Sequence, residues 1–195
     1  MVGPGMPDGT TLGTYTGSHD EPVVTVVVHS DRYALDWDAC GRLADFVSHY
    51  AGACFTRLPE QGPDLLEREE IESAISYILN ELMENAFKFR SGGSIQVRLE
   101  IGESEIRFLV SNQITPDDQV RARRVFEELL SDDPETLYLR RIEENALRDA
   151  TGDSGLGFLS IMNDYGASLG WCFDLDGQGR ILLTTQTCFP IRRAA

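Results

Sequence analysis

Apolar residues recur at intervals of three and four along residues 71–90, IESAISYILNELMENAFKFR. This repeat predicts an amphipathic helix with one broad buried stripe. The apolar positions of the stripe are Ile71, Ala74, Ile75, Ile78, Leu79, Leu82, Met83, Ala86 and Phe87. The sequence Ser-Gly-Gly at 91–93 predicts the end of this helix, because glycine favours the backbone conformation that terminates helices.

Alternating or β-branched apolar residues predict five main strands. Residues 94–101 (SIQVRLEI) and 105–111 (EIRFLVS) flank a short polar turn, which predicts a hairpin with one buried face. Residues 23–29 (VVTVVVH) predict a strand before the central helix. Residues 169–174 (LGWCFD) and 180–189 (RILLTTQTCF), joined by a glycine-rich turn, predict two closing strands.

Further helices are predicted before and after the first hairpin. Residues 37–51 have helical apolar spacing, and residues 152–158 (GDSGLGF) lead into another helical pattern. The charged stretch 115–151 predicts two amphipathic helices, the second of which starts at Pro134. The sequence therefore predicts an α+β sandwich, in which helices cover one face of a mixed, mostly antiparallel sheet.

The remaining segments are predicted to be irregular or short. Residues 1–20 are rich in glycine, threonine, proline and serine, so we expect a flexible N-terminal arm. Residues 31–35 predict a turn and a short strand, and residues 52–63 predict a connector. We expect residues 21–195 to form a single domain, because this length suits one complete core.

The net charge of −15 narrows the range of partners. Phosphate backbones and anionic membrane surfaces would be repelled, so we expect neither a nucleic acid nor a membrane partner. No stretch is apolar enough to span a membrane, and the N-terminal residues lack the features of a signal peptide, so we expect a cytoplasmic protein. The four cysteines match no zinc spacing.

Three polar residues on the central helix are candidate site residues. At about 100° per residue, Glu81, Asn85 and Lys88 project within roughly 60° of each other beside the apolar stripe. Glu81 can act as a base or orient water, Asn85 offers an oxygen to a hard cation such as Mg²⁺, and Lys88 can meet a phosphate. Alternatively, the three residues are a solvated helix edge with a local polar network.

A Gly155-Leu156-Gly157 turn that opens a helix is a second candidate. Glycines let the backbone approach an anion, and a helix N-terminus offers N–H groups and a positive dipole end. The same residues also suit a plain turn before a helix. The sequence contains neither a P-loop motif nor a dinucleotide-binding G-x-G-x-x-G after an early strand.

The order of these motifs resembles the GHKL ATPase superfamily, whose histidine-kinase-like ATPase domain is the Bergerat fold. Residues 80–88 (NELMENAFK) resemble its N box, and residues 153–159 (DSGLGFL) resemble its second glycine box. The closest resemblance is to the SiaB-like group, carried by residues 139–145 (LRRIEEN) and by residues 157–171. Anti-sigma-factor Ser/Thr kinases of the SpoIIAB/RsbW type are similar stand-alone modules.

The resemblance implies a site for ATP and Mg²⁺. It implies that Asn85 holds Mg²⁺, that Glu81 is the catalytic base or orients the attacking group, and that residues 115–151 form the ATP lid. Arg140 and Arg141 of that lid can reach a γ-phosphate, or else they belong to a solvated face. The other implied nucleotide contacts are Lys88, Asn112, Ser154, Gly155, Leu156, Gly157 and Thr185.

One position departs from the superfamily pattern. The first glycine box of the superfamily has Asp-x-Gly-x-Gly, whereas residues 110–114 of this chain are VSNQI. Asn112 falls where the adenine-binding aspartate is expected. Its side-chain carbonyl can accept a hydrogen bond from an adenine amino group but lacks the charge of a carboxylate.

The resemblance suggests a Mg-ATP-dependent Ser/Thr kinase of a bacterial partner-switching pathway that phosphorylates a STAS-like partner protein. The histidines, His19, His29 and His49, lie outside any predicted pair of dimerisation helices, which argues against a sensor histidine kinase. Two alternatives remain: a non-catalytic module that sequesters a sigma factor or regulator, and a scaffold. We also expect a homodimer, with Phe46 and Val47 exposed on the first helix.

Overall fold

The structure is a computed structural model that describes residues 9–19, 23–29, 37–55, 67–147 and 155–191. These residues form six strands and five helices. The strands are β1 (Thr10–Gly13), β2 (Val24–His29), β3 (Ser94–Ile101), β4 (Glu105–Gln113), β5 (Ser168–Leu175) and β6 (Ile181–Pro190). The helices are α1 (Trp37–Phe55), α2 (Arg68–Lys88), α3 (Pro116–Leu129), α4 (Pro134–Leu147) and α5 (Gly157–Tyr165).

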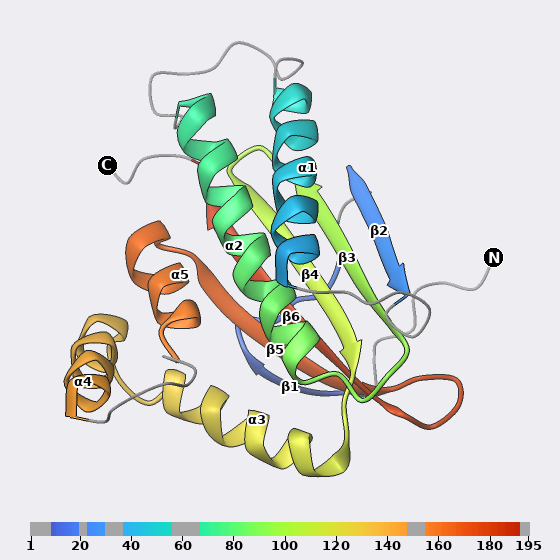
Figure 1. The fold of residues 1–195 in the computed structure, drawn as a ribbon, viewed down its shortest axis with the longest axis vertical. Helices are drawn as coiled ribbons and strands as arrows, with labels where there is room; N and C mark the ends of the chain where they lie inside the picture. The colour runs from blue at the N-terminus through green and yellow to red at the C-terminus, as the bar shows by residue number, and fades with distance from the viewer. Residues whose placement is uncertain (1–8, 20–22, 30–36, 56–66, 148–154, 192–195) are drawn as a thin grey trace.

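The strands form one open sheet in the order β1-β5-β6-β4-β3-β2. Every pairing between these strands is antiparallel, so the expected mixed sheet is wrong in this respect. Short turns join β3 to β4 and β5 to β6, which makes each pair antiparallel. Helices α1 and α2 run in opposite directions, so they return the chain to the end of the sheet where β2 finished (Figure 1).

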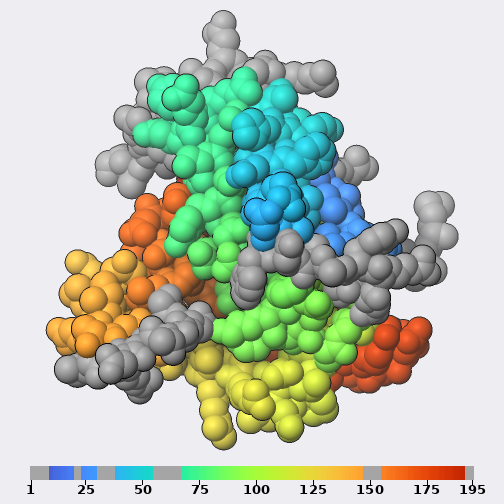
Figure 2. Space-filling view, in the orientation of Figure 1, coloured from blue at the N-terminus to red at the C-terminus, as the bar shows by residue number. Residues whose placement is uncertain are grey.

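The described helices lie on one face of the sheet, as predicted (Figure 1). Figure 2 shows that atoms of α1 and α2 cover the upper part of this face, with α3 across its lower end. Several predicted boundaries shift by a few residues: α1 continues to Phe55, beyond the predicted start of the connector, α2 runs from Arg68 to Lys88, and β4 continues to Gln113. The helices of the predicted lid, α3 and α4, are both present. The predicted turn and strand at 31–35 fall outside the described residues.

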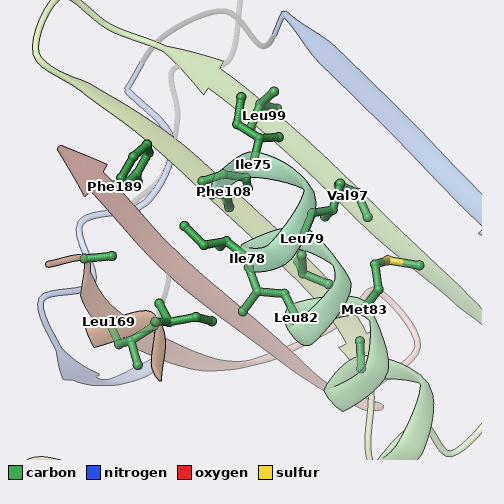
Figure 3. Packing of buried hydrophobic residues seen from close by; sticks show 14 of the residues in the cluster. Ile75, Ile78, Leu79, Leu82, Met83, Val97, Leu99, Phe108, Leu169 and Phe189 are labelled. Carbon is green, nitrogen blue, oxygen red and sulfur yellow. The ribbon is translucent and has the colours of Figure 1, made fainter. Parts of the chain in front are cut away.

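Helix α2 supplies the centre of the core. Ile78 and Leu79 are fully buried and face Val97 of β3 and Phe108 of β4 (Figure 3). Eight of the nine predicted stripe positions are buried, and Phe87 is half-buried. Burial of each large apolar side chain contributes about 1.5–3 kcal/mol. A capping box at Glu67 and Glu70 fixes the start of the helix, where Glu67 N donates to Glu70 Oε2 over 3.0 Å.

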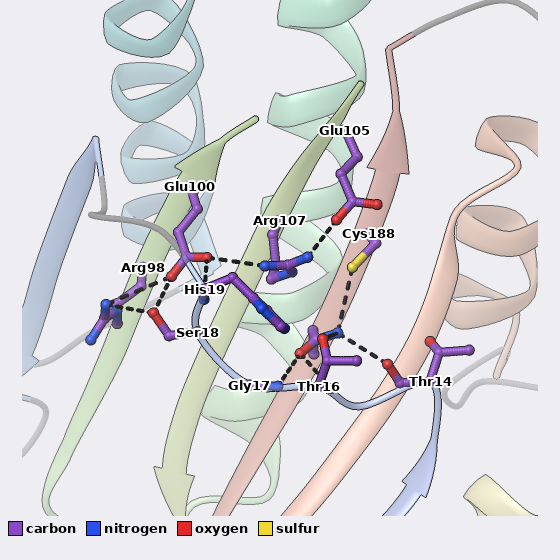
Figure 4. A network of polar contacts seen from close by, with 11 residues as sticks. Thr14, Thr16, Gly17, Ser18, His19, Arg98, Glu100, Glu105, Arg107 and Cys188 are labelled. Carbon is purple, nitrogen blue, oxygen red and sulfur yellow. Dashed lines mark hydrogen bonds and ion pairs between the residues drawn. The ribbon is translucent and has the colours of Figure 1, made fainter. Parts of the chain in front are cut away.

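Of the predicted flexible arm at residues 1–20, the structure describes residues 9–19, and these contact the sheet; residues 1–8 and 20 lie outside the described residues. Residues 10–13 form the edge strand β1, and residues 14–19 cross the face of the sheet opposite the helices (Figure 4). Gln186 of β6 is 1% exposed and holds this crossing segment. Its Oε1 accepts from the Thr16 and Gly17 amides at 3.2 and 2.9 Å, and its Nε2 donates to Thr14 O at 3.2 Å.

A second buried polar side chain holds the end of this segment. Glu100 of β3 is 1% exposed, and its carboxylate accepts from the Ser18 hydroxyl and from the His19 amide (Figure 4). Arg98 and Arg107 form ion pairs with the same carboxylate at 3.6 and 3.4 Å. A buried charge is stable only when it is paired and hydrogen-bonded, which is the arrangement here. The order of residues 14–19 therefore comes from long-range polar contacts.

Helix α3 is fastened to the sheet by an aromatic cluster. Phe126 of α3 stacks on Trp171 of β5 with ring centroids 4.1 Å apart and an interplanar angle of 9°. Phe158 of α5 meets Trp171 edge-on at 5.8 Å, and Phe173 lies 6.1 Å from Phe126. Aromatic pairs add about 0.5–1.5 kcal/mol beyond their area burial. The first helix of the predicted lid is therefore packed against the core.

Replacing Gln186 with alanine is expected to lower the free energy of unfolding by about 2 kcal/mol. The substitution leaves the backbone groups of Thr14, Thr16 and Gly17 without their partners, and a lost buried hydrogen bond costs about 1–3 kcal/mol. Urea denaturation measures the change. The exposed Gln178→Ala in the β5–β6 turn is the control, with an expected change within about 0.5 kcal/mol. Equal stability of the two variants would contradict the role of Gln186.

The free energy of unfolding is expected to fall at alkaline pH because Tyr15, in the crossing segment, loses its proton. Burial, and then the nearby Cys172 and Asp174, raise the pKa of Tyr15 from 10.0 to about 12. The neutral phenol is thus favoured in the folded state. Its contribution to the free energy of unfolding is therefore complete below pH 10 and is lost as the pH rises toward 12. Between pH 9 and pH 11, the unfolding free energy should fall more steeply in the wild type than in Tyr15→Phe, by roughly 1 kcal/mol after allowance for the partial exposure of the ring to solvent. Parallel pH profiles would contradict this assignment.

Candidate functional site

The predicted polar row on α2 borders the buried stripe. Glu81 and Asn85 are partly buried next to the buried Leu82 and Ala86, whereas Lys88 is exposed. The ammonium of Lys88 lies 5.3 Å from the ring centroid of its neighbour Phe89. These three side chains therefore occupy the C-terminal half of α2, at the edge of the core, as the helical spacing predicted.

Glu81 meets the glycine turn that opens α5. A Cβ atom on Gly157 would overlap Glu81 Oε2 and would lie 3.0 Å from Glu81 Cδ. Glycine at 157 is thus what allows the carboxylate of α2 to approach the first turn of α5. The tertiary structure brings together two motifs that lie far apart in the sequence. Ser154, another predicted contact, lies outside the described residues.

Arg141 flanks the same turn from α4. A Cβ atom on Gly155 would lie 3.7 Å from Arg141 Nη1, and Gly155 itself has a φ of +64°. Arg141 also pairs with Glu128 of α3 at 2.9 Å and, more weakly, with Glu144 at 4.0 Å. The glycine turn therefore has a carboxylate against Gly157 and a guanidinium beside Gly155.

Arg140, the other predicted lid arginine, points into a different interaction. Its guanidinium pairs with Asp132, in the turn between α3 and α4, at 3.1 Å. Its side chain is about half exposed, at 51%. Of the two arginines, only Arg141 is placed beside the glycine turn by the described contacts.

Tyr77 lies one helical turn before Glu81 and joins α2 to α5. Its ring stacks on Tyr165 with the centroids 5.2 Å apart. Burial raises the pKa of Tyr77 above its ordinary value, and the negative charge of nearby Glu81 raises it further, while a hydrogen bond with Ser160 lowers it. Tyr77, Glu81 and Ser160 therefore form a polar strip between the two helices.

Asn112 and Thr185 lie on the face of the sheet that the helices cover. Thr185 pairs with Val110, and Asn112 pairs with Leu183, so Asn112 and Thr185 are diagonal neighbours on one face. They are 3% and 9% exposed. The Asn112 amide nitrogen donates to the backbone oxygen of Gln113 at 3.4 Å, a long hydrogen bond.

Two more polar atoms are buried on this face of the sheet. Trp171 Nε1 and Thr187 Oγ1 have no hydrogen-bond partner among the described residues. Both residues are fully buried. Buried polar groups normally have a partner, so this part of the sheet retains hydrogen-bonding capacity.

The polar groups described above differ in the ligand chemistry that they suit. Phosphates suit the start of α5, because its N–H groups and the positive end of the helix dipole attract anions. The positively charged guanidinium of Arg141 attracts them as well. Asn112 and Thr185 offer the mixed donors and acceptors that suit the edge of a base. Within the described residues, no three His, Cys, Asp or Glu side chains cluster to hold a metal ion. The predicted Mg²⁺ at Asn85, which would rely on phosphate oxygens, stays a prediction.

Comparisons with known proteins assign no family. No family model matches the chain, and no curated protein matches it. None of the described helices combines the length and apolar composition needed to cross a membrane.

Several residues around the site were missed by the sequence reasoning. Tyr77 precedes Glu81 by four residues, so helical spacing alone was enough to place it on the same side of α2. The Glu128–Arg141 pair and the stack of Phe126 on Trp171 join different elements, and no local pattern indicates them.

The predicted exposure of two residues on α1 is half right. Val47 is fully buried, so its predicted exposure is wrong, whereas Phe46 is 64% exposed.

Alanine at the two glycines is expected to have different effects. Gly155→Ala forces a left-handed conformation on alanine and should cost about 1–2 kcal/mol. Gly157→Ala gains up to about 1 kcal/mol of helix propensity, which offsets the displacement of the flexible Glu81 side chain. Urea denaturation should therefore place Gly157→Ala within about 1 kcal/mol of the wild type. A greater loss in Gly157→Ala than in Gly155→Ala would show that Glu81 cannot move aside.

Proposed function

We propose that this protein is a Mg-ATP-dependent Ser/Thr protein kinase that acts on a STAS-like partner in a bacterial partner-switching pathway. The observation that carries the proposal is the meeting of Glu81 with the Gly155–Gly157 turn at the start of α5. In the proposed GHKL-type arrangement, these two motifs belong to one nucleotide site. The antiparallel sheet with helices on one face is compatible with that arrangement.

Each site residue has a proposed task. The start of α5 and Arg141 bind the phosphates, Asn85 supplies an oxygen to Mg²⁺, and Thr185 and Asn112 bind the base. When bound, Mg-ATP would supply the transferable phosphoryl group, and its Mg²⁺ would offset the negative charge of the phosphates. Glu81 then accepts or orients the proton of the partner hydroxyl, and much of the rate enhancement comes from positioning.

Replacement of Asn85 by alanine is expected to abolish Mg²⁺-dependent binding of ATP and to reduce phosphoryl transfer by at least about 100-fold. Asn85 is partly buried at the edge of the core, so the unfolding free energy should change by less than about 1 kcal/mol. Isothermal titration with ATP and a non-hydrolysable analogue, with and without Mg²⁺, measures binding. Phosphorylation of a STAS-domain protein with labelled ATP measures transfer.

The matched control for this experiment is Asn80→Ala. Asn80 is on the same helix, but its amide donates to Glu84 at 2.8 Å and its Oδ1 faces Gly41 of α1. This variant should bind and transfer as the wild type does. Equal Mg²⁺-dependent binding in Asn85→Ala and Asn80→Ala would remove the metal assignment.

A nucleotide-free interaction module is the second candidate. It is favoured by Asn112, which stands where the superfamily has an adenine-binding aspartate. Leu139 and Ile142 of α4 are 55% and 41% exposed and offer apolar contact area for a protein partner. If the wild-type protein is folded and binds no ATP with Mg²⁺ present, this second function replaces the first.

A further inference from the structure

We infer that Glu81 is a built-in competitor of the phosphate chain: its carboxylate rests on the first turn of α5, and a phosphate that binds there displaces it. The inference rests on the proposed nucleotide function. It gives Glu81 a second role. Before Glu81 acts on the hydroxyl of the partner, it competes with the phosphates of the nucleotide for the start of α5.

The first turn of α5 suits an anion that comes from outside the helix. Helix α5 has no acidic residue in its first turn, and its N-cap, Leu156, makes no side-chain capping hydrogen bond. The first N–H groups of a helix lack partners within the helix and carry partial positive charge. Glu81 of α2 brings a carboxylate to this turn, where it takes the space that a side chain at 157 would fill.

Two anions cannot share this position at low cost. A carboxylate at a helix N-terminus is stabilised by the positive end of the helix dipole. Like charges a few ångströms apart repel by an amount similar to or larger than this stabilisation. A phosphate group that approaches the amides of Gly157 and Phe158 therefore requires Glu81 to swing away.

The contact of Glu81 with the turn is made by the end of its side chain. Its side chain is partly buried, and the atom that meets Gly157 is the terminal carboxylate oxygen of a flexible chain. Arg141, which lies near Gly155, pairs with Glu128 at 2.9 Å. When a phosphate binds, it replaces the Glu81 carboxylate at the start of α5 with a group of greater negative charge. Glu81 therefore leaves the turn only when the ligand is present.

The experiment compares the affinity of two ligands in three proteins. The ligands are a non-hydrolysable ATP analogue with Mg²⁺ and adenosine, which has no phosphate. The proteins are the wild type, Glu81→Gln, and Glu69→Gln as the matched control. Glu69 is exposed in the first turn of the same helix, about three turns before Glu81, so this control removes one negative charge from α2 far from the glycine turn.

Glu81→Gln is expected to bind the ATP analogue threefold to tenfold more tightly than the wild type, with unchanged affinity for adenosine. This change is about 0.7–1.4 kcal/mol, the range of a carboxylate at a helix N-terminus. Glu69→Gln should bind both ligands as the wild type does. Glu81→Ala, checked for folding by circular dichroism, should show the same gain, because it also removes the competing charge.

Unchanged or weaker binding of the ATP analogue by both Glu81 variants would overturn the inference while leaving the proposed nucleotide site intact. An equal gain in Glu69→Gln would also overturn it, since the effect would then come from net charge. If no protein in the set binds the ATP analogue, the proposed function fails and the competition fails with it.

Discussion

The burial of the apolar stripe of α2 against the sheet is the constraint on which the rest of this structure depends. Ile78, Leu79 and Met83 are fully buried there. Because a helix repeats every 3.6 residues, fixing this stripe also fixes the direction of every other side chain on α2. Glu81 and Asn85 are therefore placed at the edge of the core by packing energy that comes from the apolar residues of the helix.

The opposite face of the sheet is stabilised in a different way. Glu100 and Gln186 are buried polar residues whose partners are mostly main-chain groups and arginines. Residues 14–19 cover these two side chains, and the two side chains in turn satisfy the amides of that segment. The two faces thus combine non-directional apolar packing on the helix side with directional hydrogen bonding on the other.

The candidate site lies where three elements meet. Helix α2 contributes Glu81, α4 contributes Arg141, and the turn before α5 contributes a backbone that is open because two of its residues are glycines. Helix α3 connects to this arrangement through Glu128 and through the stack of Phe126 on Trp171. A change in charge at the start of α5 would therefore alter the electrostatic environment of Glu81 in α2 and of the Arg141–Glu128 pair between α4 and α3.

Local periodicity was enough to predict the central helix, β3, most of β4, the helices α3 and α4, and the row Glu81–Asn85–Lys88. The glycines of the Gly155-Leu156-Gly157 turn also predicted the start of a helix, which is α5. Three features follow from the folded structure alone: the contact of Glu81 with Gly157, the burial of Val47, and the position of residues 10–19 against the sheet. These features depend on contacts between residues far apart in the chain, such as Gly17 with Gln186, and no local pattern carries that information.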